Sequence, residues 1–148
     1  MKRPTTFDGL KEEYFKLLEP LFEPFSCRAG ETVIQQGAQA TYLYIILSGK
    51  AEVSYKPYDA PPITVSHVEE GGLFGWSAVV GSEKYTSSVR AIADLEAVRL
   101  YGNDLRKLCA EHPEAGRAIL ERLAASVSSR WHDAYEQVKS ILGNGMKQ

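Results

Sequence analysis

The sequence predicts one mainly β domain with flanking helices, and three observations support this fold class. Between about residues 25 and 101, β-branched and aromatic runs alternate with Gly, Pro, Asn or Asp, as in a sandwich or barrel of many short strands. Apolar residues recur at helical steps both before and after this stretch. The length of 148 residues suits a single domain that buries a substantial core.

The composition is that of a folded chain with balanced charge. Hydrophobic residues make up 44% and charged residues 24%, and the formal net charge is −2. No block of five or six like charges occurs, which disfavours non-specific binding to nucleic acid. No apolar run approaches the roughly 18 residues of a membrane helix, and residues 1–10 lack the apolar centre of a signal peptide. We therefore expect a cytoplasmic protein with no membrane partner.

The first predicted element is a helix over about residues 8–20. Apolar residues at steps of three and four follow Asp8, whose carboxylate can cap a helix. These apolar residues are Leu10, Tyr14, Leu17, Leu18, Leu21 and Phe22. Pro20 and Pro24 end the helix, because proline lacks the amide donor that a helix requires.

The β body, over about residues 25–101, divides into short strands. Residues 41–47 are apolar on both faces, which predicts a central strand. Residues 51–55 alternate, with Glu52 and Ser54 directed outward. The other predicted strands cover residues 32–35, 63–68, 86–92 and 95–101, with a short apolar segment at residues 74–80.

Two helices follow, over about residues 103–111 and 113–142. Asn103 or Asp104 can cap the first, and Pro113 separates the two. After Pro113 the apolar residues follow steps of three, four and seven, as in a heptad seam. Such a helix spans roughly 43 Å, more than a small β body covers, so we predict a homodimer through residues 114–142. The alternative is that the helix folds back over its own β body.

No residue pattern indicates catalysis or a metal site. Neither the two cysteines, Cys27 and Cys109, nor the three histidines have the sequence spacing of metal ligands. A role for His67 as a haem ligand is a minor alternative to a structural role. There is no nucleophile motif, phosphate-binding loop or carboxylate pair. We expect neither an enzyme nor a required cofactor.

Four short motifs follow one another in a fixed order. They are Gly30-Glu31 with Ile34 and Gln36-Gly37, residues 42–49 (Tyr-Leu-Tyr-Ile-Ile-Leu-Ser-Gly), residues 72–75 (Gly-Leu-Phe-Gly) and residues 88–91 (Ser-Val-Arg-Ala). Together they resemble the cyclic-nucleotide-binding domain of the Crp/Fnr superfamily, over about residues 10–142. The resemblance implies a double-stranded β-helix jelly roll, a long C-terminal dimerisation helix, and a cyclic nucleotide or other small ligand between the two.

The resemblance also implies that residues 74–80 form a phosphate-binding cassette, a short helix with unpaired amides. In members that bind cyclic nucleotides, a Glu after the cassette's Phe-Gly accepts a hydrogen bond from the ribose, and an Arg on the next strand pairs with the phosphate. Trp76 and Tyr85 occupy these positions here. An indole accepts no hydrogen bond and a phenol brings no charge, so we do not expect high-affinity binding of cyclic AMP. Lys84 and Arg90 are the candidates to replace the missing charge, although Arg90 is equally a solvated strand residue.

The candidate ligand site combines the cassette, the following strand and the middle of the long helix. The Trp76 indole offers a stacking face, and neighbouring hydroxyls suit a less charged ligand. The alternative is that Trp76 fills the pocket as part of the core. The candidate ligand-binding residues are Phe74, Gly75, Trp76, Ser77, Tyr85, Thr86, Ser87, Arg90, Ser128, Arg130 and Trp131.

These observations predict a stand-alone regulatory sensor domain that acts on an unknown effector protein. The chain ends soon after the long helix, where transcription factors of the superfamily continue into a helix-turn-helix domain, so direct DNA binding is not expected. The alternatives are a ligand-free dimeric adaptor with a filled pocket, and a domain cut from a longer protein.

Overall fold

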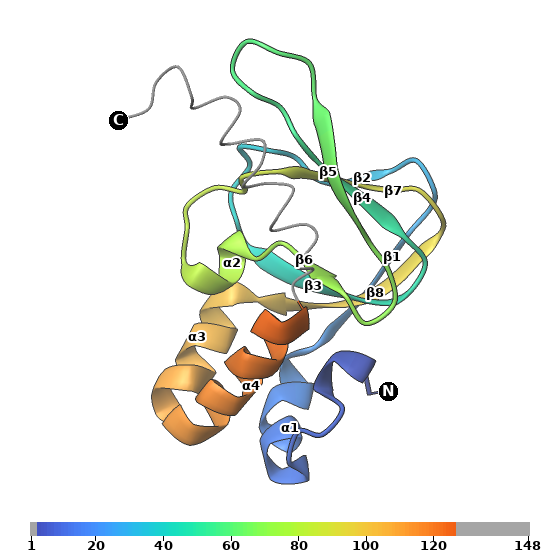
Figure 1. Ribbon diagram of the computed structural model, residues 1–148. Helices are drawn as coiled ribbons and strands as arrows, with labels where there is room; N and C mark the ends of the chain where they lie inside the picture. Colours follow the sequence, from blue (N-terminus) through green and yellow to red (C-terminus); the bar gives the residue numbers. More distant parts are fainter. Residues whose placement is uncertain (1–2, 127–148) are drawn as a thin grey trace.

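A computed structural model describes residues 3–126 of the chain, as two four-stranded antiparallel sheets with helices gathered at one end (Figure 1). The first sheet has the order β1-β8-β3-β6, and the second has the order β2-β7-β4-β5. The strands of the first sheet are β1 (Glu23–Cys27), β3 (Tyr42–Ser48), β6 (Leu73–Phe74) and β8 (Leu95–Tyr101). Those of the second are β2 (Thr32–Ile34), β4 (Ala51–Tyr55), β5 (Ile63–Val68) and β7 (Ser88–Ala91).

Strand β3 confirms the prediction of a central strand. It pairs with β8 on one edge and with β6 on the other. Leu43 and Ile45 join the core beneath the helices, whereas Tyr44 and Ile46 join the core between the sheets. Both faces of β3 are therefore covered, which explains why its sequence is apolar without alternation.

Strand β1 was not predicted as a separate element. It contains Pro24, and Pro20 and Pro24 were interpreted only as helix terminators. Strand β1 pairs with β8 alone, so it is an edge strand of the sheet. An edge strand tolerates a proline because one side of its backbone has no ladder hydrogen bonds to lose.

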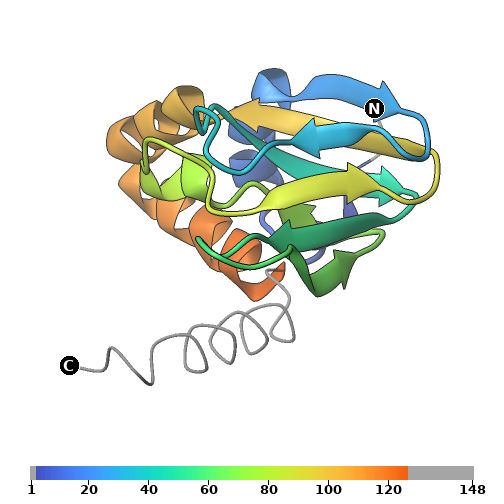
Figure 2. The same cartoon turned by 90° about the horizontal axis from the view of Figure 1, so that it is seen from above.

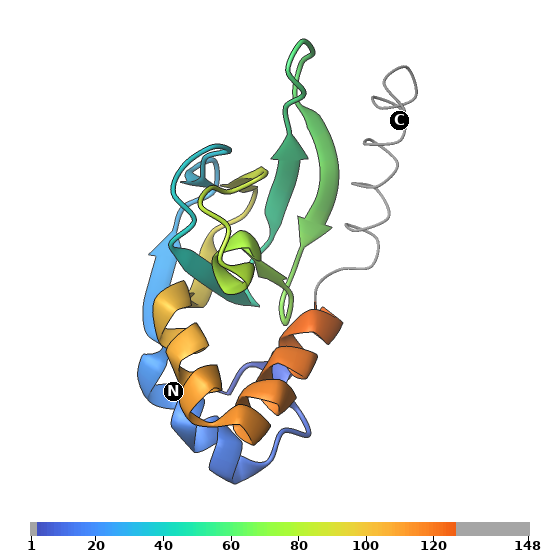
Figure 3. The same ribbon diagram turned by 90° about the vertical axis from the view of Figure 1, so that its left-hand side faces the viewer.

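The helices pack against one end of the strands (Figure 2). They are α1 (Glu12–Leu18), α2 (Ser77–Val80), α3 (Gly102–Glu111) and α4 (Pro113–Ser126), with 3-10 turns η1 (Thr5–Phe7) and η2 (Glu19–Leu21) on either side of α1. In Figure 3, α1, α3 and α4 lie together, and the β4–β5 connection extends away from them. No helix within residues 3–126 is both long and apolar enough to cross a bilayer.

The predicted helix caps were wrong. Asp8 does not cap α1, which begins after Lys11; instead the Asp8 backbone N–H donates to the Thr5 carbonyl and closes η1. Helix α3 begins after Tyr101, ahead of Asn103 and Asp104. In both cases the backbone turn into the helix begins at a residue without a capping side chain, so the capping pattern misplaced the start.

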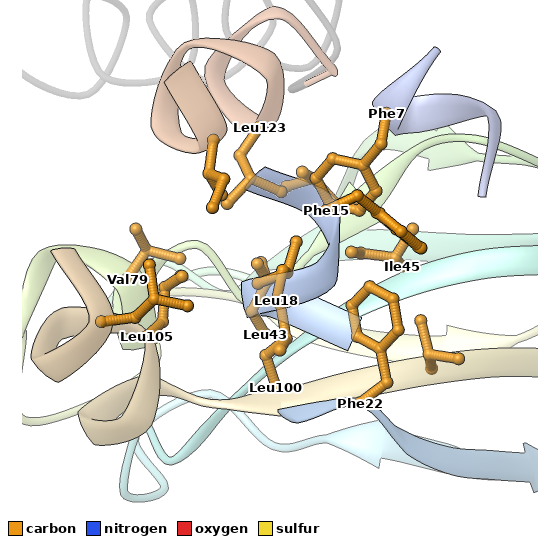
Figure 4. Packing of buried hydrophobic residues seen from close by; sticks show 14 of the residues in the cluster. Phe7, Phe15, Leu18, Phe22, Leu43, Ile45, Val79, Leu100, Leu105 and Leu123 are labelled. Atoms are coloured by element: carbon orange, nitrogen blue, oxygen red, sulfur yellow. The ribbon is translucent and has the colours of Figure 1, made fainter. Parts of the chain in front are cut away.

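Helix α4 packs its apolar side into its own domain. Ile119 and Leu123 are fully buried, and Figure 4 shows Leu123 beside Phe15 and Leu18 of the N-terminal segment. Over the described part of the chain, α4 thus covers the core of its own domain. The predicted dimer through residues 114–142 involves mainly residues that lie outside the described part.

Candidate ligand-binding site

A cavity of about 240 Å³ lies between the β6–α2 segment and the inner face of the second sheet. This volume is slightly below the roughly 300–1,000 Å³ common for small-molecule sites. Residues 74–77 and 85–87, all of them predicted ligand-binding residues, line the cavity. The remaining lining is mostly aliphatic: Ile34, Val53, Val68, Leu73, Val80 and Val89, with Ser82.

The turn from β6 into α2 depends on Gly75. Its φ of +87° lies in the region that favours glycine, and a Cβ placed there would lie 2.7 Å from the Tyr42 carbonyl oxygen. The next residue, Trp76, is the N-cap of α2. Within the described residues, the amides of Gly75 and Trp76 donate no hydrogen bond. The segment predicted to form the cassette, residues 74–80, thus consists of the end of β6, a glycine turn and the single helical turn α2.

Trp76 bounds the cavity and does not fill it. Trp76 is half-buried, lines the cavity, and packs against the core beneath the helices. It also lines a second hollow of about 320 Å³ between α2, α3 and α4, together with Leu105, Cys109 and Leu120. Trp76 and Val80 therefore both lie between the space beneath the second sheet and the space between the helices.

The Tyr85 hydroxyl is occupied by the backbone of β3. It donates to the Tyr42 carbonyl oxygen at 2.6 Å and accepts from the Tyr42 amide at 2.9 Å. Burial raises the pKa of this phenol, so Tyr85 is neutral at physiological pH. A phenol has a single proton to donate, and here it is used within the protein. In this arrangement the Tyr85 hydroxyl has no proton left to donate to a ligand.

Removing this hydroxyl should destabilise the fold. Tyr85→Phe leaves the amide and the carbonyl of Tyr42 without their partner, and we expect the free energy of unfolding to fall by about 1–3 kcal/mol. Urea unfolding measures the change. Tyr58→Phe is the matched control, since Tyr58 is 94% exposed and should show no loss. Equal stability of the two variants would contradict the role assigned to Tyr85.

Arg90 does not reach the cavity, so its place among the candidate ligand-binding residues was wrong. Arg90 lies five positions after Tyr85, and residues an odd number of positions apart in an extended segment lie on opposite faces. Its guanidinium pairs with the Glu52 carboxylate at 2.9 Å on the outer face of the sheet, and this hydrogen bond lowers the pKa of Glu52. Lys84, the other candidate, lines a separate groove beside Gln39 and Glu83.

The cavity therefore carries no charged side chain from the described part of the chain. Ser128, Arg130 and Trp131, the predicted helix contribution to the site, lie outside residues 3–126. Across that range no group of three or more His, Cys, Asp or Glu could hold a metal ion. The described lining can select a ligand by the size of the cavity and by hydrogen bonding, but not by charge.

The position of Arg90 gives a direct test. Arg90→Gln should lower the free energy of unfolding by at most about 1 kcal/mol, because the ion pair with Glu52 is solvent-exposed. Any thermal shift that about 1 mM of a nucleotide produces should be the same in the variant and the natural chain. A shift that disappears in Arg90→Gln would show that Arg90 does reach the ligand.

Sequence reasoning missed the aliphatic lining of the cavity. Val53, Val68 and Val89 lie on three strands of the second sheet and meet only after the sheet forms. The alternation of buried and exposed residues was the available signal, since Tyr85, Ser87 and Val89 are buried while Lys84, Thr86 and Arg90 are exposed. The alternation of this segment alone therefore identifies the residues that face the cavity.

Together, the two sheets and the one-turn helix α2 with its adjoining cavity define a jelly-roll domain. The sequence profile of the cyclic nucleotide-binding domain matches residues 24–112. The chain belongs to this family and has its Crp-type fold.

Named relatives agree with this assignment. The chain is 27% identical over 124 residues to a CRP-like cAMP-activated global transcriptional regulator of Mycobacterium tuberculosis. The aligned region covers 84% of this chain and 55% of that protein. The chain is 28% identical over 138 residues to a cAMP-dependent protein kinase regulatory subunit of Dictyostelium discoideum, with 89% and 41% covered. The chain thus spans about half the length of these curated relatives, or less.

The fold is also that of solved structures. A cyclic nucleotide-binding domain from Methylobacillus flagellatus superposes on this chain with a TM-score of 0.76 at 20% sequence identity. The superposed region covers 87% of this chain and 72% of the Methylobacillus chain. At this level of identity the likeness concerns the fold, and it confirms the predicted jelly roll.

Proposed function

We propose that this chain is a regulatory sensor domain that binds a small ligand in the cavity beside α2, and that it does not bind cyclic AMP with high affinity. The observation that carries the proposal is that Trp76 lines an open cavity and leaves it unfilled. The two curated relatives are named as a regulator and a regulatory subunit, which supports a regulatory role without catalysis. We infer a cytoplasmic protein that acts through an effector protein.

The signal would pass from the cavity to the helices through Trp76. The indole contacts both the cavity and the hollow between α2, α3 and α4. A ligand shifts an equilibrium only by its differential affinity for the two states. A ligand that favours one position of the indole would therefore favour one packing of α3 and α4, and a homodimer through residues 114–142 would carry this change to a partner.

Thermal unfolding of the full chain tests the proposal. The compounds are cyclic mononucleotides, cyclic dinucleotides, nucleotides and nucleosides at about 1 mM each. A ligand with a dissociation constant near 1 μM should stabilise the domain by about 4 kcal/mol, a shift of several degrees. A shift confined to one class of compound is the expected result. A flat response to all of them would contradict the sensor function and favour the dimeric adaptor.

A further inference from the structure

A polar groove lies on the surface between the residues that follow α2 and the start of α3. Its volume is about 460 Å³, within the roughly 300–1,000 Å³ common for small-molecule sites. The lining residues are Gln39, Ala40, Thr41, Ser82, Glu83, Lys84, Tyr101, Asn103 and Arg106. Most of these side chains are polar and exposed, so the groove is open to a dissolved ligand.

Backbone hydrogen bonds fix the two walls of the groove. The Ala40 amide donates to the Glu83 carbonyl oxygen at 2.9 Å. One residue further along the chain, the Thr41 carbonyl oxygen accepts from the Gly102 amide at 2.9 Å. This short segment therefore joins the loop after α2 to the start of α3, and the groove between them is a fixed feature of the fold.

Two cationic side chains line the groove from different elements. Lys84 belongs to the loop after α2, and Arg106 belongs to α3. The Arg106 guanidinium donates to the Ala78 carbonyl oxygen of α2 and to Asn103 Oδ1. A guanidinium has more N–H donors than these two bonds require, so it can bind a ligand without leaving them. A group that is already held in place also loses less entropy when a ligand binds.

The chemistry of these cations favours an oxyanion. A guanidinium matches the planar or tetrahedral oxygens of carboxylate and phosphate groups, with charge-assisted hydrogen bonds. Lys84 adds a second positive charge, and the Thr41 and Ser82 hydroxyls can donate to the same oxygens. Glu83 is an opposing charge in this lining. It should weaken the binding of an anion without preventing it, because the two cations act against it.

We propose that this groove is a second ligand site, for a small molecule that carries a carboxylate or phosphate group. The site is distinct from the cavity of the proposed function and does not depend on it. It lies next to that cavity, because Ser82 lines both spaces and Arg106 bonds to α2. A ligand in the groove is therefore placed to act on α2.

Binding of inorganic phosphate to the full chain tests the site. The chain is ¹⁵N-labelled, and the backbone amide signals of Lys84 and Asn103 are followed while phosphate replaces chloride at constant ionic strength. We expect both signals to shift and to saturate, which general screening of charge does not produce. Acetate in place of phosphate then shows which of the two oxyanions the groove prefers. Absence of a saturable shift with either anion would overturn the proposal.

Neutral variants identify the groups that bind the anion. Lys84→Gln and Arg106→Gln should each weaken binding of the preferred anion about tenfold or more, the effect of one hydrogen bond to a charged group. Glu83→Gln should strengthen the same binding, because it removes the opposing charge. Lys107→Gln is the matched control and should leave binding unchanged, since Lys107 is an exposed cation of α3 outside the groove lining.

Lys84→Gln keeps the test decisive if the other cation proves necessary for folding. Arg106→Gln also removes a hydrogen bond to α2, whereas Lys84→Gln changes an exposed side chain. Circular dichroism establishes that each variant is folded. Equal affinity of folded Lys84→Gln and Lys107→Gln for the preferred anion would refute the site.

Discussion

A chain that carries both Trp76→Glu and Tyr85→Arg is expected to bind cyclic AMP more tightly than the natural chain, by roughly two to four orders of magnitude. The two replacements supply the groups that members of the family use for the ribose hydroxyl and the cyclic phosphate. Each hydrogen bond that involves a charged group contributes about 1.5–3 kcal/mol. The cavity already provides the enclosure beside both positions. Isothermal titration calorimetry measures the gain.

A neutral double variant is the control for this experiment. Trp76→Gln with Tyr85→Gln changes the same two positions and also breaks the hydrogen bonds to Tyr42, but adds no charge. It should show no gain in affinity for cyclic AMP. Both double variants lose the Tyr85 contacts, so circular dichroism must first establish that they are folded. A folded Glu/Arg variant with unchanged affinity would mean that the cavity is not arranged like that of the cyclic-nucleotide-binding members.

The second large effect concerns Gly75. Gly75→Ala is expected to lower the free energy of unfolding by about 2–4 kcal/mol, because strain at positive φ adds to a steric contact. The added Cβ would lie 2.7 Å from the Tyr42 carbonyl oxygen, which belongs to the central strand β3 and cannot move freely. Chemical unfolding measures the loss.

Gly37→Ala separates the cost of backbone strain at positive φ from the cost of the steric contact with Tyr42. Gly37 has a φ of +91°, almost the same as Gly75, but a Cβ there would meet nothing within 4 Å. This variant therefore shows the cost of backbone strain alone, which is about 1–3 kcal/mol. Gly75→Ala should be clearly less stable than Gly37→Ala. Equal losses in the two variants would contradict a tight contact between the cassette turn and β3.

Local patterns predicted the strands well where the packing follows directly from the sequence. Residues 51–55, 63–68 and 95–101 were predicted with the bounds that the structure shows. In these strands hydrophobic periodicity and turn residues give the same answer. The short helix was placed by the resemblance, over residues 74–80, and the structure confines it to α2 (Ser77–Val80).

The rest of the site depends on contacts between distant residues. Tyr85 meets the backbone of Tyr42, 43 residues earlier in the chain, and a backbone partner leaves no mark in the sequence. Whether Trp76 fills or bounds a cavity is likewise set by how closely two sheets pack, and not by residue type. Arg90 was misplaced for a simpler reason, since the alternation of its strand was sufficient to direct it outward.

Trp76 and Val80 lie between the cavity and the packed helices. Both residues line the cavity beneath the second sheet and the hollow next to Leu105 and Leu120, so a change in the position of either residue affects both spaces. Energetic coupling of this kind is reciprocal. If a ligand of the proposed site changes how α3 packs against α4, any event that repacks these helices must change the affinity for that ligand by the same factor.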